Sequence, residues 1–352
     1  MPAETAVCQL LERQSMDYRD WLWVAPPRDA WLEEAEGRLL SADHSVVEAW
    51  RNRGKVALSA LQETLDAPPG AVLFWPKSHA LGEWWLLRLC QSLPAGTPLQ
   101  VVGENNGGIK RVLKVLASLG LGCRKRDSAR RCTLFETRME PVGIDPDLAW
   151  TRFEAEGLTL VSHPGVFGHG KLDDGTRLLL ETLPGVLPDL DAGPVANAVT
   201  KSEAEDEDEA TSRVLDVGCG DGILAAWLAP RGAAVTAVDV NAFAVEATRR
   251  TLAANQLPGE ALESDVYSRL EGRCFDLIVS NPPFHQERAI DYGPAARLIR
   301  EAPAHLAPGG QLVLVANAFL PYPDLLEAAF GSFQILADNR RFRVYLAKKP
   351  NG

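Results

Sequence analysis

The segment Val214–Gly222 constrains the fold of this chain more than any other. It reads Val-Leu-Asp-Val-Gly-Cys-Gly-Asp-Gly. Its first half is rich in strand formers, and its three glycines allow a tight turn and a close approach of the backbone to a ligand. The apolar residues at 223–228 then continue at helical spacing. The segment therefore predicts a buried strand, a glycine turn and a helix that starts at the turn.

Two more apolar segments extend this pattern. Ala234–Asp239 ends in an acid, and Phe275–Ser280 runs into Asn281-Pro282-Pro283-Phe284. Parallel strands present their carboxyl ends at one edge of a sheet, so we expect the turn, Asp239 and Asn281 to share that edge. Further strands are expected at 261–264, 311–315 and 343–347, and a helix at 242–254.

The first half of the chain shows a similar alternation. We expect strands at 71–75, 98–102 and 132–137 and helices at 82–90 and 109–119, which indicates a small α/β domain with a largely parallel sheet. This half lacks the glycine turn, so we predict no cofactor there. Residues 1 to about 65 are expected to be mostly helical, and Pro141 to about Leu160 to be a linker.

Composition narrows the class of protein. A chain of 352 residues suggests two domains, and a net charge of -11 excludes a protein that coats nucleic acid through its overall charge. Six cysteines without metal-ligand spacing indicate reduced thiols and no metal site. We find no signal sequence and no membrane-spanning segment, and therefore expect a cytoplasmic protein. The stretch at about 188–211, with six acids in 203–209, is expected to be a flexible insertion.

One segment is strongly basic against this acidic background. This segment, residues 110–131, has a single acid, Asp127, and eight basic residues: Lys110, Arg111, Lys114, Arg124, Lys125, Arg126, Arg130 and Arg131. A solvated helix face and loop would account for them. We favour a patch that contacts RNA phosphates, because the charge is so one-sided.

The glycine turn and the acids around it indicate the kind of cofactor. Asp216, Gly218 and Gly220 lie in a G-x-G-x-G turn, which differs from the dinucleotide pattern G-x-G-x-x-G. Each acid alone could be a helix cap or a loop carboxylate. As a set, Asp239 could accept from ribose hydroxyls, and Asp265 from an adenine amine with the Val266 backbone against the ring. Acids at the turn would repel a pyrophosphate, so the site fits S-adenosyl-L-methionine better.

Asn281-Pro282-Pro283-Phe284 predicts chemistry at a planar amine. The lone pair of an exocyclic base amine is delocalised into the ring, so the nitrogen must become pyramidal before it attacks a methyl group. The Asn281 side-chain oxygen and the Pro282 carbonyl could each accept one amine hydrogen and so orient the lone pair. The prolines keep this corner extended, and Phe284 could stack on a base that has left its helix.

A glycine-rich loop at 165–175 precedes this domain and leads into a helix that Asp174 or Thr176 is expected to cap. We expect the loop to form a lid, with Phe167, Asp173 and Gly175 contacting the cofactor. His163 and His169 flank it, and we expect them to be surface residues without a role.

Together these motifs resemble the bacterial 16S ribosomal RNA guanine-N2 methyltransferases of the small-subunit methyltransferase C type. The resemblance covers most of the chain and is strongest at 103–105, 165–180, 214–222, 281–284 and 315–324. It implies an α/β protein with two tandem Rossmann-like methyltransferase domains, each with a seven-stranded, mostly parallel sheet. Residues 1–145 would support RNA binding without a cofactor site, and residues 146–352 would catalyse. The acidic insertion is longer than the family leads us to expect.

The resemblance implies N2-methylation of one guanine in 16S rRNA within the small ribosomal subunit, and we expect the protein to be a monomer. The motifs also leave open another rRNA guanine-N2 target or an adenine-N6 target, and, with less support, protein glutamine methylation. From a different class, the chain could be a non-catalytic ribosome-assembly factor with a methyltransferase fold. The intact Asn281 and glycine turn argue against that alternative.

Overall fold

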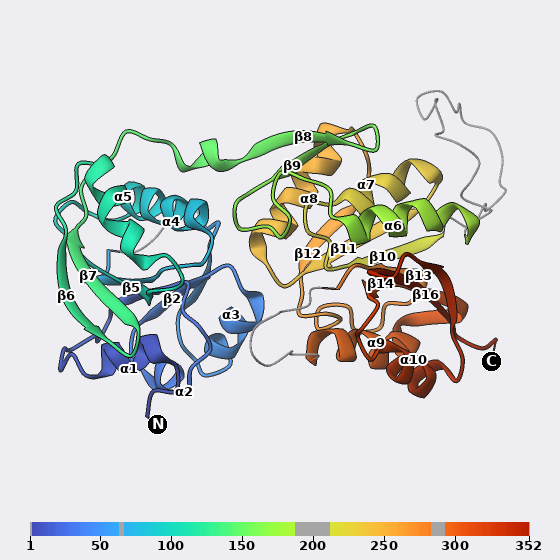
Figure 1. Cartoon of the computed structure of the whole chain (residues 1–352), viewed down its shortest axis with the longest axis horizontal. Coiled ribbons are helices and arrows are strands. Elements are labelled where there is room, and N and C mark those ends of the chain that lie inside the picture. Colours follow the sequence, from blue (N-terminus) through green and yellow to red (C-terminus); the bar gives the residue numbers. More distant parts are fainter. Residues whose placement is uncertain (1, 63–66, 187–211, 283–292, 352) are drawn as a thin grey trace. The chain divides into compact units, whose positions relative to one another are not determined.

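The chain folds into two α/β units. The computed structural model describes residues 2–62, 67–186, 212–282 and 293–351, and the chain divides into the units Met1–Trp150 and Thr151–Gly352 (Figure 1). Pro283, Phe284 and the acidic insertion lie outside the described residues. Across the described ranges, every helix is too short or too polar to cross a bilayer.

The second unit is built on a seven-stranded sheet of order β12-β11-β10-β13-β14-β16-β15. The first five strands in this order are parallel, and β16 runs antiparallel to both β14 and β15. The strands are β10 (Arg213–Val217), β11 (Ala234–Asp239), β12 (Glu260–Glu263), β13 (Phe275–Ser280), β14 (Leu306–Asn317), β15 (Gln334–Asp338) and β16 (Phe342–Lys348). The predicted mostly parallel seven-stranded sheet is confirmed.

Helices cover both faces of this sheet, and alternation along the strands explains how (Figure 1). Val214 packs in the cluster of α6 (Asp174–Thr182), α7 (Ile223–Leu228) and α8 (Ala242–Ala254), whereas its neighbour Leu215 packs in the cluster of α9 (Gly293–His305) and α10 (Tyr322–Phe330). Consecutive strand residues point to opposite faces, so apolar residues at every position are buried on both sides. Short 3-10 turns, η3 (Leu183–Gly185) and η5 (Ala229–Arg231), follow α6 and α7.

A hairpin of β8 (Thr151–Ala155) and β9 (Leu158–Ser162) opens the second unit. The Val161 amide donates to Thr251 Oγ1 of α8 at 2.9 Å. The expected linker up to Leu160 is therefore wrong over 151–160. The partners that hold this hairpin lie about ninety residues further along the chain, so the local sequence does not reveal them.

The first unit repeats the same topology, with order β3-β2-β1-β4-β5-β7-β6. Its strands are β1 (Leu22–Val24), β2 (Arg38–Ser41), β3 (Ala57–Ser59), β4 (Ala71–Phe74), β5 (Pro98–Glu104), β6 (Arg124–Ala129) and β7 (Cys132–Arg138). Its helices are α1 (Ala6–Glu12), α2 (Ala30–Glu34), α3 (His44–Arg51), α4 (His79–Ser92) and α5 (Val112–Ser118), with 3-10 turns η1 (Ile109–Arg111) and η2 (Pro146–Ala149). The two α/β units confirm the predicted tandem fold.

The expectation of a mostly helical segment up to about residue 65 is wrong in part, because β1, β2 and β3 alternate there with three helices. These strands have three or four residues, which is too short to show a period of two. What defines β1 is its position between β2 and β4 at the centre of the sheet, where all three of its residues are buried.

The glycine turn after β10 is shaped by close packing as well as by backbone conformation. Gly222 has φ +82°, and a Cβ atom there would lie 2.8 Å from the Cα of Thr248 in α8. Gly232 has nearly the same φ, +84°, but nothing lies within 4 Å of its Cβ position. The two glycines therefore separate the cost of conformation from the cost of packing.

We expect Gly232→Ala to lower the free energy of unfolding by about 1–2 kcal/mol, because a left-handed residue with a Cβ is strained. Gly222→Ala should cost roughly 1–3 kcal/mol more, because α8 must also move. Urea denaturation of the two variants measures the difference. Equal losses would show that α8 does not pack on the turn as the structure has it.

Candidate active site

The glycine turn is fixed to the end of the neighbouring strand. The Gly218 amide donates to the Val238 carbonyl at 2.8 Å, and the Gly220 amide donates to Asp239 Oδ2 at 3.1 Å. The other oxygen of Asp239 accepts from the Asn241 amide at 2.9 Å. The structure thus brings together the predicted residues Gly218, Gly220 and Asp239 at the carboxyl edge of the sheet. Asp239 is partly exposed.

Asp216 lies beneath this turn and is fully buried. Neither of its carboxylate oxygens has a hydrogen-bond partner among the described residues. Burial raises its pKa to about 8, and the nearby charge of Asp239 contributes to the rise. Burial likewise raises the pKa of Asp221, in the same turn, to about 7. A buried carboxyl group without a partner is costly, and such groups concentrate at functional sites.

Asp265 and Val266 follow β12, next to β11 at the same edge. The Asp265 carboxylate is paired with Arg297 of α9, with Nη1 3.1 Å from Oδ2. Val266 is buried and has φ +55°. A β-branched residue in this conformation is strained, and such strain clusters at functional sites. The Arg297 partner was not foreseen from the sequence.

Asn281 lies directly after β13, and two hydrogen bonds set the orientation of its side-chain amide. Its side-chain Nδ2 donates to Asp173 Oδ2 at 3.0 Å and to Thr176 Oγ1 at 2.8 Å. A carboxylate only accepts hydrogen bonds, so the amide nitrogen must face it. The two contacts use both N–H groups of the amide, and no described residue donates to its oxygen. Pro282, the next residue, is buried.

The same aspartate begins helix α6. Asp173 Oδ2 accepts from the Gly175 amide at 2.8 Å and from the Thr176 amide at 3.2 Å, which makes Asp173 the N-cap. The expectation that Asp174 or Thr176 caps the helix is therefore wrong, because only the side chain before the first helical residue can reach these amides. A Cβ at Gly175 would lie 2.9 Å from Asp173 Oδ2, so a larger residue would disturb the cap.

Sequence reasoning missed Thr176 as a contact of Asn281. The two residues are 105 positions apart. The one available signal was the Asp-x-x-Thr spacing in front of an apolar run, which points to a helix start and not to a partner.

The loop before α6 is anchored on α8. His163 is fully buried and stacks on Phe243 at 4.3 Å between ring centroids. Burial lowers the pKa of His163 to about 3, so the ring is neutral. Asn241 Nδ2 donates to the Gly165 carbonyl at 2.7 Å. The expectation that His163 is a surface residue is wrong, because the ring fills a gap against α8. Phe167 further along the loop is 69% exposed.

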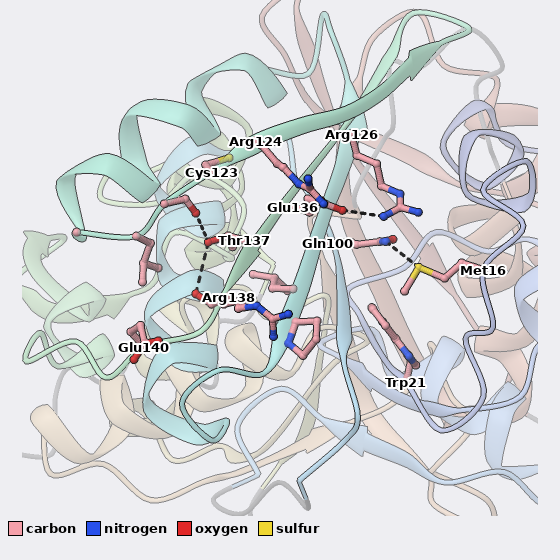
Figure 2. A pocket seen from close by; sticks show the side chains of 15 residues that line it. Met16, Trp21, Gln100, Cys123, Arg124, Arg126, Glu136, Thr137, Arg138 and Glu140 are labelled. Carbon is pink, nitrogen blue, oxygen red and sulfur yellow. Dashed lines mark hydrogen bonds and ion pairs between the residues drawn. The ribbon is translucent and has the colours of Figure 1, made fainter.

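The eight basic residues of the first unit do not form a single patch. Arg124 and Arg126 reach from β6 to Glu136 on β7, beside a hollow of about 730 Å³ (Figure 2). This hollow includes Pro98 at the start of β5 and therefore opens at the amino edge of the parallel strands. The other six residues are exposed, and their side chains form no ion pair with a described residue: Lys110, Arg111, Lys114, Lys125, Arg130 and Arg131.

Four of these six lie towards the carboxyl edge of the first sheet. Arg130 and Arg131 form the turn between β6 and β7, and the Asn105 amide after β5 donates to the Arg131 carbonyl at 2.8 Å. Lys110 and Arg111 lie in η1, beside β7. The charges of these four exposed side chains are therefore available to a ligand. In the described ranges, no three histidine, cysteine or acidic side chains are grouped so that they could hold a metal ion.

Comparison with known proteins identifies the family of this chain. The Methyltransferase small domain family matches residues 157–346, and the Methyltransferase small domain N-terminal family matches residues 9–151. The ribosomal RNA small subunit methyltransferase C of Chromohalobacter salexigens is 66% identical over 99% of both chains. This chain belongs to the ribosomal RNA small subunit methyltransferase C family.

Other members of the ribosomal RNA small subunit methyltransferase C family agree. The protein from Yersinia pestis is 42% identical over 82% of this chain and 77% of its own length. A solved structure, "T. Thermophilus 16S rRNA N2 G1207 methyltransferase (RsmC) in complex with AdoMet and Guanosine", superposes with a TM-score of 0.82. It is 29% identical and covers 99% of this chain and 94% of its own.

The buried Asp216 generates a prediction on stability. Its pKa rises on folding from 3.8 to about 8. Below about pH 4, Asp216 is protonated in both the folded and the unfolded protein, so its ionisation does not oppose folding. As the pH rises towards 8, it ionises more readily in the unfolded protein, and the folded protein progressively loses stability. We expect Asp216→Asn, which cannot ionise, to gain stability relative to the wild type as the pH rises from 5 to 8.5. Thermal unfolding across this range measures the difference.

Asp276→Asn is the matched control. Arg213 lowers the pKa of Asp276, so its contribution is present above its unfolded pKa and is lost as the pH falls through the lower folded pKa. Its variant should be less stable than the wild type at neutral pH and approach it in acid. A pH-independent difference for Asp216→Asn would contradict an ionisation on this side chain.

Proposed function

We propose that this protein transfers a methyl group from S-adenosyl-L-methionine to the N2 amine of a guanine in 16S rRNA. In this proposal residues 151–352 catalyse and residues 1–150 bind RNA. The observation that carries the proposal is the orientation of Asn281. Asp173 and Thr176 hold its amide nitrogen, which leaves the oxygen as a fixed acceptor at the edge that also carries the glycine turn and Asp239.

The residues at this edge fit the cofactor. Glycines in the turn expose backbone, because the side chains of Cys219 and Asp221 between them are buried. The buried Asp216 lies beneath the turn, where a cationic ligand would favour its ionised form. Asp239 is partly exposed at the end of β11, and its carboxylate would accept from the ribose hydroxyls. Asp265 and the Val266 backbone would hold the adenine. When bound, S-adenosyl-L-methionine supplies an activated methyl group.

The protein's own contribution is to position the amine. Asn281 Oδ1 and the Pro282 carbonyl each accept one amine hydrogen and direct the nitrogen lone pair away from the base plane. The Asp173 carboxylate polarises the Asn281 amide through its N–H group, which makes Oδ1 a stronger acceptor. The amide therefore needs no reorganisation during the reaction. Stacking of the base on Phe284 stays a prediction, as does any part played by Pro283 or Phe167.

The guanine target is supported by the relatives. The T. thermophilus protein is described as acting on N2 of G1207 and is bound to AdoMet and guanosine. In the first unit, the position that corresponds to Asn281 after β4 is Trp75, which is buried and packs on Gly82 and Gly103. An indole in this position offers no acceptor for an amine, which supports catalysis by the second unit alone. The assembled small subunit as substrate, the monomeric state and the cytoplasmic location stay predictions.

We expect Asn281→Ala to lower kcat at least 100-fold, because the acceptor is lost, and to change cofactor affinity by no more than a few fold. Thr176→Val should lower kcat less, roughly 3- to 30-fold, because Asp173 still holds one N–H group. Transfer of tritiated methyl groups into small subunits from a strain that lacks the gene measures both, and mass spectrometry of the 16S rRNA identifies the base. Undiminished turnover of Asn281→Ala would refute the assigned role.

The exposed basic residues of the first unit should bind RNA phosphates. We expect the triple variant Lys110→Gln, Arg111→Gln, Arg131→Gln to bind small subunits more weakly and with a shallower salt dependence. The slope of log K against log salt should fall by roughly two units. Arg124→Gln is the control, because Glu136 already compensates the charge of Arg124. A wild-type slope in the triple variant would show that these residues are solvated surface charges that do not contact RNA phosphates.

A further inference from the structure

The catalytic unit exposes an aromatic ring beside two arginines. Phe319, in the loop after β14, is 67% exposed, and only one other aromatic side chain among the described residues, Phe167, is comparably exposed. Arg340 and Arg341 lie in the turn between β15 and β16. The Ala318 amide, next to Phe319, donates to the Arg341 carbonyl at 2.9 Å, so the two loops are joined through their backbones.

This surface adjoins the candidate active site. Asn317 at the end of β14 pairs with Phe342 at the start of β16, which places both loops at the carboxyl edge of the sheet. Arg341 Nη1 lies 2.8 Å from Asp174 Oδ2. Asp174 follows Asp173, the residue that holds Asn281. A chain segment bound to Phe319 and Arg340 would therefore lie next to the corner that receives the base.

The backbone of the turn is strained at Arg340, which has φ +71°. Glycine or asparagine would adopt this conformation at lower cost. The guanidinium of Arg340 is exposed and forms no hydrogen bond or ion pair with a described residue, and its charge contributes to the lowered pKa of Asp338. A strained backbone at an exposed arginine favours a functional reason.

The first unit shows the same feature independently. The corresponding turn, between β6 and β7, consists of two arginines that both have left-handed backbones, Arg130 at φ +51° and Arg131 at φ +61°, whereas in the three-residue turn of the second unit only Arg340 does. Two-residue turns of this kind favour Asn-Gly. An arginine with a left-handed backbone at the same edge of both sheets favours an anionic ligand at each.

We propose that Phe319 and Arg340 hold the RNA strand that flanks the target guanine. Phe319 stacks on an unpaired neighbouring base, and Arg340 contacts a phosphate of the same strand. The proposal rests on the proposed function, because it names a further part of the substrate for the same site. Aromatic stacking combined with cationic phosphate contacts is how proteins bind single-stranded nucleic acid. Arg341 is engaged with Asp174 and positions the turn.

The two residues should have different salt signatures. Stacking releases no counterions, whereas a phosphate contact contributes about 0.7 to the slope for a single strand. We expect Phe319→Ala to weaken binding to unmethylated small subunits roughly 5- to 100-fold with an unchanged slope. Arg340→Asn should weaken binding roughly 3- to 10-fold at low salt and lower the slope by about 0.7. Its melting temperature should be unchanged or higher, because asparagine tolerates the turn.

Arg300→Gln, which removes an exposed charge from the middle of α9, is the matched control and should leave affinity and slope close to wild type. The experiment measures the dissociation constant of full-length variants for small subunits from the deletion strain at five or more salt concentrations, together with methyl transfer. Wild-type affinity and slope in both Phe319→Ala and Arg340→Asn, while the wild-type enzyme methylates the subunits, would overturn this proposal alone. A wild-type enzyme that neither binds nor methylates them would overturn the proposed function itself.

Discussion

The hydrogen bond from the Asn281 amide to Asp173 is the interaction on which the rest of the site depends. It joins the end of β13 to the start of α6, and through α6 to the loop that His163 anchors on α8. Asp173 caps the helix and orients the amide with the same carboxylate oxygen. Helix α6 and the Asn281 side chain are therefore coupled, and a change at either one alters the other.

The two units share one topology but differ at the positions that form the proposed site. Both sheets have the same strand order, so the difference lies at the strand ends. After β10 the second unit has three glycines, whereas after β1 the first unit has Ala25 and two prolines. After β13 it has Asn281, whereas the first unit has the buried Trp75 after β4. The buried indole of Trp75 in the first unit therefore takes the position that Asn281 has in the second.

Two strained residues and one unpaired buried carboxylate lie at the carboxyl edge of the second sheet. Val266 and Arg340 adopt left-handed backbones there, and the Asp216 carboxylate is buried without a described partner. Each is costly to stability, and the tight packing of α8 on the glycine turn holds the region in place. Costly residues at this edge are expected if they serve ligand binding.

The sequence by itself determined the α/β class, the glycine turn with Asp239, and the position of Asn281 after a buried strand, because each depends on residues that are near neighbours in the chain. It could not predict the short strands β1, β2 and β3, which are defined by their partners in the sheet. Only the tertiary structure decided that Asp173 and Thr176 orient Asn281, that Arg297 pairs with Asp265, and that Glu136 compensates two of the basic residues. These contacts join residues 10 to 108 positions apart, and their geometry exists only once the sheets and the helices packed on them have formed.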